Sequence, residues 1–319
     1  MIVKHNFAPL KVWGYIRKPL LFAWSWSIVV WLLSLKMAPQ FLALNFAPVG
    51  VLGSALAIFV AFRNNSAYGR WWEARQLWGG IVNASRVLAR LVITFSDSHA
   101  HQPQFDRQRS EQFKREMVLA AIAWVHALRF QLRGQLQEPE AKSLLKRYVS
   151  AEDRELLERF DNLPHGLHWI MGRKIYAAMA NGTLGGFDSF QMEGQLLALA
   201  NLQGSCERIK NTPLPRQYDF FTRLFIGLFS VLLPFGLLGF FGAPEAEAQR
   251  WLIIPLTTLL AAVFIIMEKT GAANEDPFEN RSTDVPLTAL CNTIERDLLQ
   301  LLGEPEQPAK LQPVDGYLY

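Results

Sequence analysis

The chain has 319 residues, enough for one large domain or two of ordinary size. Half of the residues are hydrophobic and ten are Trp, which excludes a disordered chain. The net charge of +4 is mild and no block of Lys or Arg is present, so we expect no nucleic-acid partner. The two cysteines, Cys206 and Cys291, are too few for a disulfide framework and are expected to be reduced thiols.

Residues 1–36 join a basic segment to an apolar run. Lys4, Lys11, Arg17 and Lys18 have no acidic residue beside them up to position 19, and residues 20–35 are almost entirely apolar. The run is long for a signal peptide, and no small-residue cleavage site follows it closely. We therefore expect a retained membrane anchor.

A second apolar run, residues 41–62, continues without a break into polar sequence. Pro48 suits the first turn of a helix, and no further Pro occurs before Trp78. We therefore expect one helix over residues 48–78, about 45 Å long, which leaves the bilayer on the cytosolic side.

Four residues of this helix recur at every fourth position and lie along one slowly drifting stripe: Ser54, Ile58, Phe62 and Ser66. By periodicity alone the stripe fits ordinary helix packing. It also fits the lining of a narrow apolar pore, where rings of Ile and Phe gate by excluding water.

The region from about residue 63 to 219 is helical in pattern. Residues 109–136 carry apolar residues three and four apart, with Ser110 as the expected N-cap. Residues 151–164 open with acids and predict a helix that stops before Pro164, and residues 191–215 predict a third amphipathic helix. No alternating strand pattern and no internal repeat occurs.

Two further apolar runs, residues 224–241 and 251–267, form a second hairpin. The four runs are 16 to 22 residues long, and a helix needs roughly 20 apolar residues to cross about 30 Å of hydrocarbon. Flanking Trp and Lys extend the shorter runs into the interface. The sequence therefore predicts an all-α integral membrane protein with four transmembrane helices, rather than a soluble helical protein.

Basic residues predict the orientation. The links within the two hairpins contain few, whereas the N-terminal segment and the residues after the second run contain many. We expect the termini and the middle region in the cytoplasm. The expected organisation is 1–96 (basic flank and first two spans), 97–219 (cytosolic helices), 220–267 (last two spans) and 268–319 (cytosolic C-terminal region and Pro-rich tail).

No catalytic or cofactor motif is present. His99 and His101 could supply two metal ligands, but surface-loop histidines are far commoner than metal sites. NGTLGG at 181–186 lacks the Lys and Ser/Thr of a phosphate loop. We expect no enzymatic activity, no cofactor and no bound metal.

Residues 63–80, RNNSAYGRWWEARQLWGG, resemble the signature of the bacterial branch of the bestrophins. The preceding GSALAIFVAF resembles the neck helix of that family, and residues 205–215 and 275–299 agree with it as well. The resemblance covers about residues 1–300. Signature positions with an expected structural role are Asn64, Asn65, Arg70, Trp71, Trp72, Glu73, Asp276, Pro277 and Phe278.

The resemblance implies a homopentameric ion channel in which five copies of the second membrane helix surround an axial pore. It implies a pore neck at Ser54, Ile58 and Phe62, and this makes pore lining our main interpretation of the stripe. The family commonly has a larger apolar residue at position 54, so a ring of Ser would shorten the apolar neck. A second constriction is implied at the cytosolic exit, at Phe187 with Phe190 as the alternative.

The resemblance leaves the sign of the permeant ion open. The eukaryotic branch is anion-selective, whereas the bacterial branch resembles a monovalent cation pathway. A ring of five Asp188 carboxylates at the exit would favour cations, and Arg63 would oppose them if it faced the pore. We expect small monovalent cations, with a chloride channel of the same architecture as the alternative.

The eukaryotic branch also carries a calcium clasp in an acidic run after the fourth membrane helix. Here the acids Glu275, Asp276, Glu279 and Asp284 are dispersed among other residues. Calcium needs six to eight oxygen ligands, so we expect no calcium gating.

Two other functional classes fit the sequence less well. A secondary transporter would place ionisable residues or broken helices at mid-membrane. Pro234 interrupts the third run, but no run contains an ionisable residue. A membrane-anchored enzyme or scaffold would need a polar constellation in residues 97–219, where none stands out. The expected partners are copies of the chain itself, the lipid of a bacterial inner membrane and permeant monovalent ions.

Overall fold

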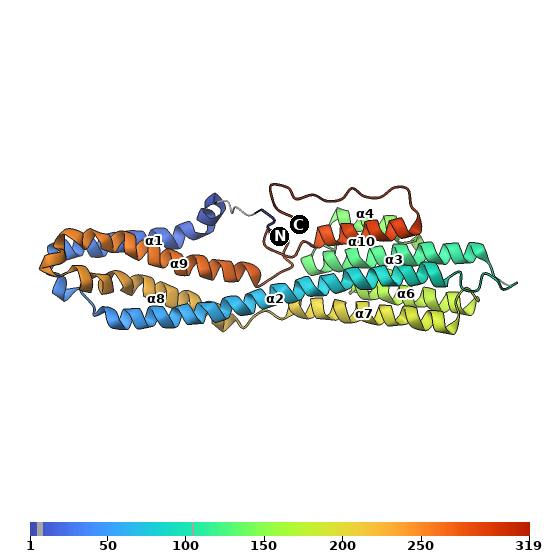
Figure 1. The fold of residues 1–319 in the computed structure, drawn as a ribbon, viewed down its shortest axis with the longest axis horizontal. Coiled ribbons are helices and arrows are strands. Elements are labelled where there is room, and N and C mark those ends of the chain that lie inside the picture. The colour runs from blue at the N-terminus through green and yellow to red at the C-terminus, as the bar shows by residue number, and fades with distance from the viewer. Residues whose placement is uncertain (5–8, 104) are drawn as a thin grey trace. The chain divides into compact units, whose positions relative to one another are not determined.

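The computed structural model describes residues 1–4, 9–103 and 105–319 and is helical almost throughout (Figure 1). Its elements are α1 Pro9–Lys36, η1 Pro39–Phe41, α2 Phe46–Phe95, α3 Arg107–Arg133, α4 Pro139–Tyr148, α5 Ala151–Leu157, α6 Leu163–Ala180, α7 Gly186–Asn211, α8 Arg216–Phe241, η2 Pro244–Leu252, α9 Ile253–Asn274 and α10 Leu287–Leu302. Within the described ranges, strand-like pairing is limited to isolated bridges of Tyr317 with Ile2 and Val314. The predicted all-α fold is confirmed.

Four helical segments are long and apolar enough to cross a membrane: Val12–Lys36, Phe46–Phe95, Arg216–Phe241 and Ala246–Asn274. The four predicted spans are thus confirmed by length and composition. The start of the second differs, because Phe41 ends the short helix η1 and α2 begins at Phe46. The Asn45 side chain accepts a hydrogen bond from the Ala47 N–H at 2.9 Å, which caps the new start.

The chain folds into two compact units. We call residues 4–71 and 213–276 the membrane unit, and residues 1–3, 72–212 and 277–319 the head unit. Helix α2 is one helix of 50 residues and contributes to both units. The organisation expected from the sequence, with boundaries at 96, 219 and 267, separates membrane-spanning from cytosolic segments and stays a prediction.

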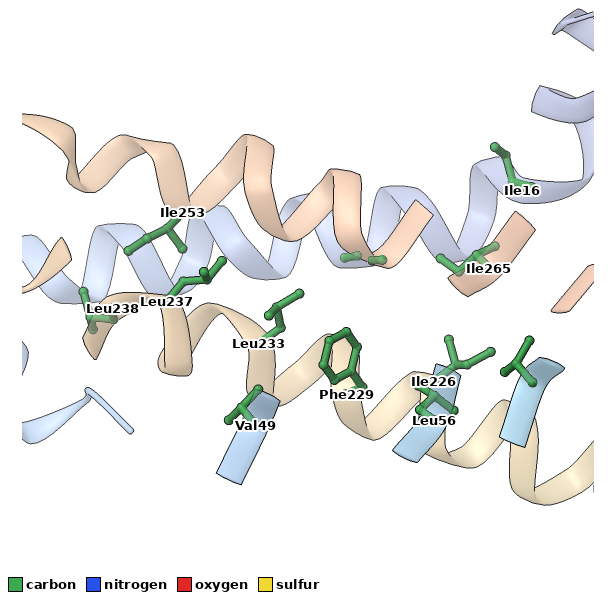
Figure 2. Packing of buried hydrophobic residues seen from close by; sticks show 13 residues of the cluster. Ile16, Val49, Leu56, Ile226, Phe229, Leu233, Leu237, Leu238, Ile253 and Ile265 are labelled. Atoms are coloured by element: carbon green, nitrogen blue, oxygen red, sulfur yellow. The ribbon is translucent and has the colours of Figure 1, made fainter. Parts of the chain in front are cut away.

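A cluster of buried aliphatic and aromatic side chains holds the membrane unit together (Figure 2). Helix α2 contributes Val49, Leu56 and Val60, and α8 contributes Phe229 and Leu233. Gly53 permits the close approach of these two helices, since a Cβ atom there would lie 2.9 Å from the Phe229 ring. One face of α2 is therefore fixed in the core.

In the head unit, α3 packs against α4, α6, α7 and α10, and its Met117 and Trp124 are fully buried. The predicted cap of this helix was wrong. Asp106 is the N-cap and accepts from the N–H groups of Gln108 and Arg109. Ser110 lies in the first turn, and its hydroxyl donates to the Ser96 carbonyl oxygen at 2.9 Å.

The predicted helix over residues 151–164 is also divided differently. Helix α5 ends at Leu157, and α6 begins at Leu163 with Pro164 in its first turn. The Asn162 side chain caps this second start by accepting from the His165 N–H at 3.0 Å. Pro164 therefore starts a helix, which its missing N–H permits.

Candidate pore-lining face and its supports

The predicted neck residues share one uncovered face of α2. In a single copy of the chain the exposed fraction is 58% for Ile58 and 70% for Phe62, and Ser54 is exposed as well. Val49 and Leu56 lie about half a helical turn away from this stripe and are buried. The helix therefore has an apolar face that its own chain leaves free.

The two serines of the stripe use their hydroxyl protons inside the helix. Ser54 Oγ donates to the Gly50 carbonyl oxygen at 3.0 Å, and Ser66 Oγ donates to the Phe62 carbonyl oxygen at 3.1 Å. What Ser54 presents outward is an oxygen with free lone pairs. No charged side chain belongs to the stripe from Ser54 to Ser66.

Arg63 is turned away from the stripe into the protein, and its side chain is 3% exposed. One guanidinium nitrogen, Nη2, lies 2.8 Å from Asp219 Oδ1 and 3.3 Å from Glu275 Oε2. The other, Nη1, donates to the Glu268 carbonyl oxygen at 3.2 Å. A buried cation needs such partners. Arg63 therefore does not lie on the exposed stripe, and its role in selectivity stays a prediction.

The next signature residues hold the carboxyl end of α9. Asn64 Nδ2 donates to the Met267 carbonyl oxygen at 2.9 Å, and Arg70 Nε donates to the Glu275 carbonyl oxygen at 2.9 Å. A Cβ atom at Gly271 would lie 1.9 Å from Asn64 Oδ1, so this approach requires glycine. The signature segment therefore acts as a clamp between α2 and α9.

Of the remaining signature residues, some pack against neighbouring side chains and others are exposed. The Tyr68 and Trp71 rings stack with centroids 6.1 Å apart, whereas Asn65 and Trp72 are exposed. In the head unit Glu73 pairs with Arg208 at 2.6 Å. Asp276 is the last residue of the membrane unit, and Pro277 begins the last segment of the head unit. The Pro277 carbonyl oxygen accepts from the Val285 N–H, and Phe278 is fully buried.

Three of the four acids after α9 contact other protein groups. Glu275 pairs with Arg63, Glu279 lies 2.5 Å from Lys210 Nζ, and Asp284 accepts from the Arg281 N–H at 3.0 Å. Among the residues that the structure describes, no group of three His, Cys, Asp or Glu side chains could hold a metal ion. Absence of calcium gating stays a prediction.

The two candidate exit residues project from the first two turns of α7. Phe187 is 68% and Phe190 73% exposed in one copy of the chain, and the Phe187 ring lies 6.4 Å from the Phe95 ring. Asp188 between them is turned inward. Its Oδ2 atom accepts from Gly185 N–H and Ser98 Oγ, each at 2.9 Å, and lies 3.2 Å from His99 Nε2. This carboxylate caps the helix that presents both phenylalanines.

Sequence reasoning missed the partners of the two charged candidates. Ser98, His99, Asp219 and Glu275 lie far along the chain from the residues that they contact. Asp219 carried one usable signal, since it is the only acidic residue between Glu207 and Glu245, at the start of an apolar run. An isolated acid in such a flank suggests a buried ion pair.

The model of a family described as bacterial and fungal bestrophin proteins matches residues 7–300. The chain belongs to the bestrophin family. This bestrophin is 33% identical over 273 residues to YneE of Escherichia coli, which is described as a voltage-dependent anion channel-forming protein, with 86% of this chain and 82% of YneE covered. A protein of Mesorhizobium japonicum with the same description is 30% identical, with 86% and 80% covered.

The solved structures agree with the family assignment. The crystal structure of a bacterial bestrophin homologue from Klebsiella pneumoniae has a TM-score of 0.77 to this bestrophin at 29% identity. The match covers 90% of this chain and 98% of the Klebsiella chain. The resemblance stated from residues 63–80 is therefore confirmed, and the fold extends over nearly the whole chain.

Proposed function

We propose that this bestrophin is a passive ion channel of the bacterial inner membrane. Five copies surround an axial pore, with Ile58 and Phe62 as its apolar neck and a ring of Ser54 at one end of that neck. Phe187, or Phe190 as the alternative, narrows the exit into the cytoplasm. The observation that carries this proposal is the uncovered apolar stripe on a helix whose opposite face is fixed in the core.

Self-association is supported by a second set of exposed apolar side chains, in the head unit. Tyr176 on α6 and Phe190 and Leu197 on α7 are all well exposed in one copy. Soluble monomers rarely leave several large apolar side chains together in water, whereas interfaces between subunits bury them. The number five comes from the family resemblance, and the native mass of the purified detergent complex tests it.

A channel fits better than a transporter or an enzyme. The stripe carries no ionisable group that would bind and release a coupled proton or ion. The relatives described as channel-forming proteins support the same class. The basic segment before α1 supports an orientation with both termini and the head unit in the cytoplasm.

We favour small monovalent cations as the permeant ions, because Ser54 presents hydroxyl oxygens and no outward donor to the stripe. The alternative is an anion channel of the same architecture. It is favoured by the descriptions of the relatives from Escherichia coli and Mesorhizobium japonicum. The two candidates share the neck and differ only in the sign of the ion that crosses it.

Current across a planar bilayer that holds the purified protein tests the proposal. With a KCl gradient, a reversal potential near the K⁺ equilibrium value supports the cation channel, and a value near the Cl⁻ equilibrium value supports the alternative. Replacing KCl by NaCl on one side then measures discrimination among cations. Absence of current at every voltage, both for the native protein and for the Ile58→Ala/Phe62→Ala variant, would contradict channel function.

A further inference from the structure

A cleft opens between α1, α8 and α9 of the membrane unit. Its volume is about 200 Å³. It is lined by Pro19 and Phe22 of α1, by Arg223, Ile226, Gly227 and Ser230 of α8, and by Ile265, Glu268 and Lys269 of α9. These residues all belong to one compact unit, and none of them belongs to the α2 stripe.

The cleft exists because α1, α8 and α9 do not pack tightly against one another beside Gly227. A Cβ atom built on Gly227 would meet no atom within 4 Å, so α8 leaves a gap where other residues would fill it. Ile226 and Ile265 are buried, and Figure 2 shows both toward the same end of the helix bundle, opposite Leu238 and Ile253. The inner wall of the cleft is therefore apolar.

The mouth of the cleft is basic. The Arg223 side chain is 61% exposed and that of Lys269 is 34% exposed. Lys18 is exposed one helical turn before Phe22, on the same side of α1. Each of two cations contacts one acid: Arg223 pairs with Asp219, and Lys269 Nζ lies 3.2 Å from Glu268 Oε2.

These two carboxylates do not neutralise the mouth. Asp219 also pairs with the buried Arg63 at 2.8 Å, and Glu268 is almost fully buried. Ion pairs link these groups into a set of four cations and three carboxylates: Arg63, Arg216, Arg223 and Lys269 with Asp219, Glu268 and Glu275. The site keeps a net positive charge and offers hydrogen-bond donors that an anionic oxygen would satisfy.

The charged residues also lie at a common depth. Lys18 closely precedes the apolar run 20–35, Arg223 directly precedes 224–241, and Lys269 closely follows 251–267. All three therefore stand where an apolar span ends, at the level of lipid headgroups. Basic pockets between membrane helices on the cytoplasmic side suit anionic headgroups.

We propose that this cleft binds one anionic glycerophospholipid of the cytosolic leaflet. Its phosphate accepts hydrogen bonds from Arg223 and Lys269, with Lys18 adding charge, and an acyl chain lies along the exposed ring of Phe22. Phosphatidylethanolamine binds less well, because its ammonium group meets the same cations. The inference rests on the membrane location and orientation proposed above, and not on ion conduction.

Native mass spectrometry of the purified detergent complex, titrated with phosphatidylglycerol or phosphatidylethanolamine, tests this site. Each basic residue near an anionic surface contributes about a fivefold factor in affinity. The Arg223→Gln/Lys269→Gln variant should therefore bind phosphatidylglycerol about thirtyfold more weakly than the native protein. Lys36→Gln is the matched control, because it removes one exposed charge at the opposite end of α1 and should leave binding unchanged.

The charge-conserving variant Arg223→Lys/Lys269→Arg should retain binding, and this separates lost charge from lost folding. Equal binding of the two lipids, or full binding by the doubly neutralised variant, would overturn the site. The bilayer recording is independent of this readout. If the lipid binds but neither the native protein nor the Ile58→Ala/Phe62→Ala variant carries current, the lipid site stands and the channel is rejected. If current flows but lipid binding is not selective, the channel stands and the lipid site is rejected.

Discussion

At the scale of single residues, charge is kept away from the uncovered stripe of α2. Arg63 follows the neck directly in the sequence, yet it is buried against Asp219 and Glu275. Asp188 lies between two exposed phenylalanines, yet it is 7% exposed and caps α7. The proposed neck and exit thus present aromatic and aliphatic surface. We therefore expect hydration, rather than an ion pair, to control passage through them.

The neck assignment predicts larger currents when its side chains are shortened. In the Ile58→Ala or Phe62→Ala variant the apolar constriction widens and holds water more readily, so conductance or open probability should rise. Single-channel recording measures either change. Leu21→Ala is the control, because it removes a similarly exposed apolar side chain from α1. Unchanged currents in both neck variants would remove these residues from the pore.

Substitution of Asp188 is expected to change the stability of the head unit rather than the current. The Asp188→Asn variant weakens the bonds from Gly185 N–H and Ser98 Oγ, and loss of a helix cap costs about 1 kcal/mol. We expect a fall of several degrees in the thermal unfolding midpoint and an unchanged reversal potential. Asp161→Asn, at an exposed acid of the head unit, should change neither quantity. A shifted reversal potential with unchanged stability would instead support the carboxylate ring.

The alignment of Ser54, Ile58 and Phe62 on one face of a helix could be predicted from the sequence, because a period of four is visible within a single helix. That this face is exposed could not be predicted from the period alone. The burial of Arg63 and Asp188 could not, since their partners come from other helices or loops. Asp219 and Glu275 are more than 150 residues away from Arg63. The local sequence around a charged residue does not show whether its side chain faces solvent or pairs with a residue far away along the chain.

At the scale of elements, the clamp between α2 and α9 depends on the side-chain amide of Asn64 and on the absence of a side chain at Gly271. Asn64 donates to the Met267 carbonyl oxygen, and Gly271 leaves the room that this contact needs.

The apolar runs in the sequence identified the membrane spans, because length and composition decide whether a helix can cross a membrane. Helix ends were predicted less well, since Asn45, Asp106 and Asn162 cap helices at positions that the apolar pattern does not mark.

The clamp predicts a strong effect of one added methyl group. In the Gly271→Ala variant the new Cβ atom would lie 1.9 Å from Asn64 Oδ1, so Asn64 must move and lose its bond to Met267. We expect the membrane unit to lose about 1–3 kcal/mol, measured as unfolding in a denaturant series in detergent.

Gly14→Ala is the matched control for this substitution. A Cβ atom at Gly14 meets nothing within 4 Å, so the higher helix propensity of Ala should leave stability equal or raised. Adding Asn64→Ala to Gly271→Ala removes the clash, and the double variant should lose less than the two single losses combined. Equal stability of Gly271→Ala and the native protein would contradict the clamp.

At the scale of the whole molecule, the two units are stabilised by different means. The membrane unit buries an aliphatic and aromatic cluster together with the ion pairs of Arg63, whereas the polar group buried in the head unit, around Glu295, includes a histidine. His126 Nε2 lies 2.9 Å from one Glu295 carboxylate oxygen, and the Tyr148 hydroxyl donates to the other. Unfolding of the head unit is therefore expected to depend on pH.

Burial lowers the pKa of His126, and the nearby Glu295 offsets this only in part. Burial alone would raise the pKa of Glu295, but the hydrogen bonds from His126 and Tyr148 outweigh it and lower that pKa. Both groups bind protons more readily in the unfolded chain, so the stability that they contribute is lost as the pH falls. The loss begins near the unfolded value of about 6.5 for His126, and Glu295 adds to it below about 4.5.

Acidification from pH 7 to pH 5 should therefore destabilise the head unit. The limiting slope is about 1.4 kcal/mol per pH unit for one proton taken up on unfolding. The thermal midpoint of the full chain in detergent, followed over this range, measures it. His126→Gln should flatten the dependence, whereas His101→Gln, at an exposed histidine, should not. Parallel pH curves for the native protein and His126→Gln would exclude His126 as the source.

The hydroxyl proton of Ser54, held by the Gly50 carbonyl oxygen, has a consequence for any anion that enters the proposed pore. From Ser54 through Ile58 to Phe62, no outward side chain donates a hydrogen bond. A halide would have to give up or carry its own water through this segment, since nothing replaces the lost hydration. Permeability among anions would then rise with ionic radius, and weakly hydrated iodide or thiocyanate would pass more readily than chloride.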